Sequence, residues 1–444
     1  MKRWLVVLLV VLALIVLISP GIVGRLAEQN LKGSIGWAES QSEDFLVTEE
    51  IFQRGWFTAE GRHRIELKEG ELRSAIVELT GREAAADDSI PALVVDTRID
   101  HGLVPITSMS RASGSLMPRL ASTVSTMHLD PGDGELIAVP GALYSHVGLS
   151  GETASRYLLD AGRFEDENAK VQWSGADLSV TANPSSRSMQ YEGTLQPASV
   201  ESDNDFAQVG LTRFSGDLRQ SEYGFAVGSI KLDIGTLSLR QGEGEGVTTG
   251  FREIALDAGS EIEDGRVNAK SVLHLGGVAV PDFGAVDVDM DVTVSGLEAR
   301  STQTIIAALK ARPDDPAALA SAYPHIESDV QKLLSSGAEI RFDRLDVSLP
   351  QGEVTATLRF ELPQTDGSAE FSWPSLLLAL TASADVRLSV ALMEMAQEAD
   401  PQSGALVAMG ILKEDGDFYV MSAQYAKGLL TVNGAPLPIP LPSR

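Results

Sequence analysis

The chain has 444 residues, 43% of them hydrophobic, and no cysteine, so neither disulfides nor thiolate metal sites can hold it together. Its formal net charge of −27 excludes the electrostatic attraction to phosphate backbones on which nucleic-acid-binding proteins depend. The length suits two or three domains or one elongated domain, and burial of apolar surface must stabilise the fold.

The amino end carries an uncharged run of twenty residues, Trp4 to Val23, directly after Lys2-Arg3. That is about the length that crosses a ~30 Å hydrocarbon core as a helix. Short flanks rich in Lys and Arg stay in the cytoplasm, so the rest of the chain should lie outside. A cleaved signal peptide is the alternative, but Ser19-Pro20-Gly21 lacks the Ala-x-Ala pattern of a cleavage site. We therefore predict an uncleaved single-pass anchor over residues 1–24.

Beyond the anchor, apolar residues recur mostly with a period of two, which is typical of strands with one buried face. In Val286–Val294 they alternate with three Asp and one Thr, and Val354–Leu362 shows the same pattern. Such strands belong to antiparallel sheets with one wetted side. We therefore predict an α+β fold, mainly antiparallel β, with extended curved sheets and, besides the anchor, a few late helices.

Helical periodicity is confined to residues 302–334 and 388–412, and Pro324 should interrupt the first of these stretches. Because the helices follow a long series of strands, they should pack on one face or end of the sheet. We expect a first β-rich region over residues 25–200 and a second over residues 201–444 that contains both helical stretches.

Carboxylates at Asp287, Asp289, Asp291 and Glu298 match positions one, three, five and twelve of a calcium-binding loop. That loop needs glycine at position six for its sharp turn, and Val292 stands there instead. The same spacing arises on the outer face of a strand. We interpret these residues as the wetted face of a strand and expect no metal site.

The sequence also lacks the spacings that mark common metal and nucleophile sites. The six histidines show no metal-ligand spacing, and there is no Gly-x-Ser-x-Gly elbow that would expose a nucleophile. We therefore expect no cofactor and no enzymatic activity, and an envelope hydrolase assembled from distant residues is the least favoured alternative.

Three segments stand out: Phe52–Thr58, Ile99–Pro105 and Gly428–Pro438. In the first, Gly55 should turn the backbone while Trp56 and Phe57 fill the apolar face of a sheet. In the second segment, His101-Gly102 should form a turn. In the third, Asn433-Gly434 should form the turn of a hairpin.

Together with the anchor and in this order, these segments resemble the YdgA-type family of Gram-negative envelope proteins of unknown function, over nearly the whole chain. The family's middle motif reads His-Gly-Pro, whereas Leu103 and Val104 precede Pro105 here. The resemblance implies an inner-membrane protein with the bulk of the chain in the periplasm, and a distant likeness to AsmA-like proteins, whose curved sheets are thought to handle lipid. It implies no catalytic residues.

The leading hypothesis is a non-enzymatic protein that binds or passes lipid acyl chains along a curved sheet. Partners would be the inner membrane, through the amino-terminal helix, and a lipid ligand, with no nucleic acid. Candidate groove residues are Val288, Met290, Leu358 and Phe360. The alternative is an envelope scaffold or assembly factor that engages other envelope proteins, in which case the same residues belong to a closed core.

Overall fold

The computed structural model of the chain describes residues 45–68, 92–101, 119–130, 136–165, 169–202, 205–241, 247–280, 284–310, 316–364 and 372–437. The chain forms two compact units, one of residues 1–164 and 172–196 and the other of residues 165–171 and 197–444. The expected anchor over residues 1–24 lies outside the described residues. Among the residues that are described, no helix is long and apolar enough to cross a membrane.

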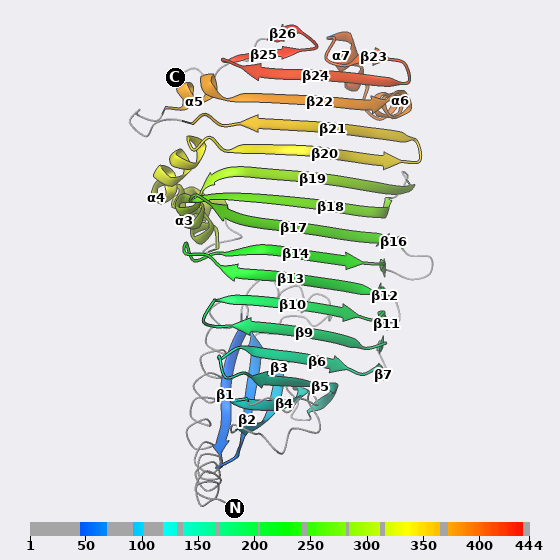
Figure 1. The fold of residues 1–444 in the computed structure, drawn as a ribbon. Coiled ribbons are helices and arrows are strands. Elements are labelled where there is room, and N and C mark those ends of the chain that lie inside the picture. Colours follow the sequence, from blue (N-terminus) through cyan, green and yellow to red (C-terminus); the bar gives the residue numbers. More distant parts are fainter. Residues whose placement is uncertain are drawn as a thin grey trace, which may run out of the picture. The chain divides into compact units, whose positions relative to one another are not determined.

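In the first unit, neighbouring strands pair antiparallel from β1 to β10 (Figure 1). They are β1 (Phe45–Arg54), β2 (Thr58–Leu67), β3 (Ala92–His101), β4 (Ala121–Asp130), β5 (Ile137–Val147), β6 (Thr153–Leu159), β9 (Ala176–Asn183) and β10 (Ser188–Leu195). One face of β2, β3 and β4 holds a small closed core of Ala59, Ile99 and Ala121, against which Phe52 and Val147 pack.

The second unit contains a larger antiparallel sheet in which strands follow one another as a ladder (Figure 1). They are β13 (Thr212–Gln220), β14 (Ala226–Ile234), β17 (Glu253–Glu263), β18 (Arg266–Val280), β19 (Gly284–Glu298), β20 (Glu339–Leu349), β21 (Gly352–Glu361), β22 (Thr381–Ser389), β24 (Phe418–Ala426), β25 (Leu429–Val432) and β26 (Ala435–Leu437). The short β23 (Lys413–Asp415) also pairs with β24.

Shorter strands between these segments pair separately, in the order β11 (Ala198–Ser202), β12 (Asp205–Val209), β15 (Leu237–Gln241) and β16 (Val247–Phe251). Two further short strands, β7 (Gly162–Glu165) and β8 (Ala169–Trp173), contain residues of both units. The described residues thus confirm an α+β fold made mostly of antiparallel β-structure.

The helices of the second unit lie at the ends of its strands (Figure 1). They are α3 (Ala299–Lys310), α4 (Pro316–Leu334), α5 (Trp373–Ala379), α6 (Val390–Ala399), the single 3₁₀ turn η1 (Pro401–Ser403) and α7 (Gly404–Ala408). At one end α3 and α4 contact β19, and at the other α6 contacts β21, β22 and β24. The predicted interruption at Pro324 is wrong, because α4 continues through this residue. A proline removes one backbone donor and can kink a helix without ending it.

Candidate functional site

The larger sheet of the second unit has one face that carries apolar residues in register from strand to strand, which we call the apolar face. Cross-strand partners on this face form rows that run perpendicular to the strands. The central row consists of Leu232, Leu256, Leu273, Met290, Leu345, Ala356, Val386 and Met421. A second row consists of Ile234, Ile254, Leu275, Val288, Val347, Val354 and Leu388.

All residues of these two rows remain partly exposed, although they lie in the middle of a large sheet. Fully buried apolar residues on this face occur nearer the strand ends, as at Val267 and Val286. A second layer of helices or strands normally covers the apolar face of a sheet completely. Here the helices lie at the strand ends (Figure 1), and among the described residues the second sheet contacts the larger one where β16 meets β18.

Bulges keep the apolar residues on this face, and one of them lies in β18. Between Leu275 and Val278, the inserted Gly276-Gly277 opposes the single residue Asp287 of β19. Gly277 has φ +60, and its N–H donates to the Asp287 carboxylate. Without such an insertion the alternation of β18 would reverse faces beyond it, since side chains alternate with a strict period of two.

The second bulge lies in β20, where Phe342 and Leu345 both carry apolar side chains on the same face although three positions separate them. Asp343 is the extra residue opposite β19, and its carboxylate accepts a hydrogen bond from the Thr293 hydroxyl at 2.9 Å. The spacing Phe-x-x-Leu was a sequence signal for this bulge.

The opposite face of the sheet is polar and carries charges of both signs. Asp289 and Asp346 stand directly opposite each other on β19 and β20, and like charges in that position repel. Arg344 bonds both carboxylates, at 2.8 Å and 2.6 Å, while His274 Nδ1 lies 2.7 Å from Asp289. The hydrogen bond to Asp346 is the main cause that raises the pKa of Arg344. These side chains lie in one cluster and stay partly exposed.

A cavity of about 720 Å³ lies over this polar face, lined by residues that include Asp343, Arg344, Asp385 and Arg387. Carboxylates outnumber cations in its lining. Among the described residues, however, no group of three His, Cys or acidic side chains could hold a metal ion. Asp287, Asp289 and Asp291 lie in the extended strand β19 and do not converge. Asp287 accepts a hydrogen bond from a backbone N–H, Asp289 contacts His274 and Arg344, and Asp291 stands opposite Arg344 in the register.

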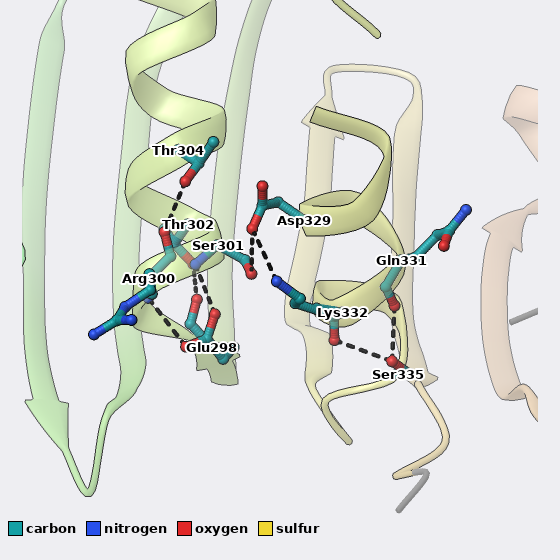
Figure 2. Close-up of polar contacts among 9 residues, drawn as sticks. All are labelled: Glu298, Arg300, Ser301, Thr302, Thr304, Asp329, Gln331, Lys332 and Ser335. Atoms are coloured by element: carbon teal, nitrogen blue, oxygen red, sulfur yellow. Dashed lines mark hydrogen bonds and ion pairs between the residues drawn. The ribbon is translucent and has the colours of Figure 1, made fainter. Parts of the chain in front are cut away.

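The end of β19 is fixed to the helices through Glu298 (Figure 2). Its carboxylate accepts hydrogen bonds from the backbone N–H groups of Arg300 and Ser301, at 3.3 Å and 2.6 Å. Burial raises the pKa of Glu298, but the hydrogen bonds from Ser301 and Arg300 outweigh it and the net pKa is lowered. The Ser301 hydroxyl donates to Asp329 at 3.1 Å, which ties α3 to α4. The helices therefore brace the strand end.

The apolar face contains all four predicted groove residues: Val288, Met290, Leu358 and Phe360. The first two lie on β19 and the other two on β21, and β20 runs between these strands. Each is partly exposed, and Phe360 is 38% exposed. Sequence reasoning missed the neighbours that complete the rows, such as Leu256 and Leu345. The alternation in each strand marked them, but the register between strands could not be read.

The aromatic motif Phe52–Thr58 differs in part from what the sequence predicts. Gly55 does form a turn, since its N–H donates to the carbonyl of Thr58 at 2.7 Å. However, Trp56 and Phe57 are 58% and 49% exposed and do not fill the core. The core of this region consists of Ala59, Ile99 and Ala121, with Phe52 and Val147 packed against it.

The two other motifs, Ile99–Pro105 and Gly428–Pro438, are described to different extents. His101 is the last residue of β3 and is buried. Gly102, the other residue of the expected turn, lies outside the described residues. Asn433-Gly434 forms the predicted hairpin turn between β25 and β26, with φ angles of 50° and 80°. Asn433 also accepts a hydrogen bond from Ser422 N–H and donates to the carbonyls of Gly410 and Ile411.

The fold defines a protein of the α+β class in which the larger antiparallel sheet has one apolar face and one polar face. The chain belongs to the family described as "Bacterial protein of unknown function (DUF945)", whose family model matches residues 1–440. It is similar to Protein YdgA of Escherichia coli (strain K12), at 23% identity over 283 residues. That alignment covers 59% of the chain and 52% of YdgA, so it spans about half the length of this relative. No solved structure matches the chain. The family description names no enzymatic activity.

Proposed function

We propose that the chain is a non-enzymatic protein of the cell envelope, anchored in the inner membrane by residues 4–23, with its bulk in the periplasm, and that it binds lipid acyl chains on the apolar face. The observation that carries the proposal is the partial exposure of the central apolar rows. Removing partly exposed apolar surface from water is favourable by about 25 cal/mol per Å², so a ligand that covers these rows would be stabilised there.

The dimensions of the face support an acyl-chain ligand. From β14 to β24 the central row crosses eight strands, and seven spacings of ~4.8 Å give a path of roughly 34 Å. One acyl chain covers half of a ~30 Å hydrocarbon core. The rows are therefore long enough for more than one chain, or for one chain to move along them.

Site-specific photo-crosslinking in the full chain tests this proposal. Leu358 and Thr357 are adjacent in β21 and their side chains point to opposite faces of the sheet. A photoreactive phenylalanine analogue in place of Leu358 should give lipid adducts in intact cells, detected by mass spectrometry of the peptide. The analogue in place of Thr357 is the matched control and should give none.

The same experiment separates the two leading functions. If position 358 crosslinks to another envelope protein and to no lipid, the acyl-chain proposal is rejected and the scaffold function replaces it. Met290 provides a second position in the central row, with Thr293 as its polar-face control on the same strand.

The anchor is tested independently of the ligand. The charged start and the uncharged run predict that the full chain stays in the membrane fraction after carbonate washing, with its carboxyl end in the periplasm. A soluble mature form that begins near residues 21–25 would reject the anchor in favour of a cleaved signal peptide.

A further inference from the structure

One end of the first unit's sheet displays large apolar side chains to solvent. Trp56 and Phe57 occupy the turn between β1 and β2, where they are 58% and 49% exposed. Leu149 occupies the turn between β5 and β6 and is 58% exposed. We call these three residues the apolar end.

The strand register places both turns at the same end of the sheet. The N–H of His101, the last residue of β3, donates to the carbonyl of Phe57 at 2.9 Å. His101 stands opposite Ala121 on β4, and Ala121 stands opposite Val147, the last residue of β5. The β5–β6 turn follows directly. The strands β2 and β5, which lie beside these turns, are thus three strand spacings apart, roughly 14 Å.

Both turns are short and closed by backbone hydrogen bonds. Gly55 N–H donates to the Thr58 carbonyl at 2.7 Å, and Gly148 N–H donates to the Glu152 carbonyl at 2.8 Å. The small closed core that contains Ile99 lies directly beneath them. The exposed side chains therefore belong to hydrogen-bonded turns next to a buried core.

We propose that the apolar end contacts the surface of the lipid bilayer in which the chain is anchored, with Trp56, Phe57 and Leu149 inserted at the headgroup level. Trp and other aromatic residues favour this zone because their rings match its mixed apolar and polar character. The chain's net charge of −27 disfavours docking onto anionic headgroups through charge, so apolar insertion is the contact that remains.

The chain connection permits this contact, and this step rests on the proposed anchor. Residues 24–44 join the apolar run to β1, and these 21 residues span up to roughly 70 Å when extended. β1 has 10 residues and runs from this connection toward the apolar end, a distance of roughly 33 Å. The connection is therefore long enough for the apolar end to reach the membrane.

The absence of cysteine allows a clean test on the full chain in proteoliposomes. Gln53→Cys places a single fluorescent label on the exposed part of β1 beside the turn. Ile137→Cys places the same label at the opposite end of the sheet, where Ile137 begins β5 and is 40% exposed. Lipids with a nitroxide at the headgroup should quench the label at position 53 and leave the label at position 137 unquenched.

Trp56→Ser combined with Phe57→Ser, in the Gln53→Cys background, should abolish this quenching while the circular dichroism spectrum stays unchanged. Equal quenching at both positions, no quenching at either, or quenching that survives the double replacement would overturn the proposal. Disulfide-linked dimers through position 53 that form without lipid would assign the apolar end to a second copy of the chain.

The anchor and the apolar end can fail separately. If carbonate washing releases the chain, the anchor is rejected, and vesicles of neutral phosphatidylcholine with nitroxide headgroups are then added to the released chain. Quenching at position 53 under these conditions supports the apolar end alone, whereas its absence rejects it.

Discussion

At the scale of single residues, His146 is a titratable group whose environment disfavours its charged form. Burial, and then repulsion from Arg119, lowers the pKa of His146 from its ordinary value of 6.5. The unfolded chain therefore takes up a proton near pH 6.5, whereas the folded chain takes it up only at lower pH. The stability that depends on neutral His146 is complete above pH 6.5 and is lost as the pH falls from there through the folded-state pKa.

His146→Gln should therefore flatten the loss of stability between neutral and mildly acidic pH. The effect of the histidine is at most about 1.4 kcal/mol per pH unit within that window. Denaturant unfolding of the detergent-solubilised chain above and below pH 6.5 measures it. A pH dependence that is unchanged in His146→Gln would contradict the assignment to His146.

At the scale of secondary-structure elements, the bulge in β18 sets which side chains reach the apolar face. Gly277 has φ +60, and a Cβ there would lie 1.9 Å from Arg252 Nε. Gly277→Ala adds backbone strain of about 1–2 kcal/mol and forces Arg252 to move. Gly151→Ala is the matched control, since Gly151 has φ +82 with open space around it.

Gly277→Ala should lower the free energy of unfolding by more than Gly151→Ala does, and it should reduce lipid crosslinking at position 290 on the neighbouring strand. Chemical denaturation and the crosslinking yield provide the two readouts. If the two alanine variants behave alike, the bulge tolerates an ordinary residue and register does not depend on it.

Sequence alone could predict the elements better than their surroundings. The alternation in Val286–Val294 and the pair Asn433-Gly434 correctly predicted a strand and a hairpin turn, because period and turn chemistry are local. Local patterns could not predict that Trp56 and Phe57 are exposed. They also could not predict that α4 continues through Pro324. Both depend on what packs nearby, and hydrophobicity says which face of a strand is apolar without saying whether anything covers it.

At the scale of the whole molecule, the small core of the first unit and the central rows of the second unit differ in how far their apolar side chains are exposed. The first unit encloses Ile99, which is 2% exposed, in a small closed core. The second unit leaves the central rows of a much larger face partly exposed. A charge introduced at a closed site loses its hydration, whereas a long side chain at a half-open site can extend its charged group into water.

Met290→Lys and Ile99→Lys should therefore have unequal effects on folding. We expect Met290→Lys to lower the free energy of unfolding by about 1 kcal/mol, and Ile99→Lys by more than about 4 kcal/mol. Denaturant unfolding of the two full-length variants measures the difference, with Met290→Leu and Ile99→Val as conservative controls. Met290→Lys should also abolish lipid crosslinking at position 358, because a cation on the face makes it a poor surface for acyl chains. If both lysine variants unfold the chain to the same extent, the apolar face is closed in the folded protein and cannot hold an acyl chain.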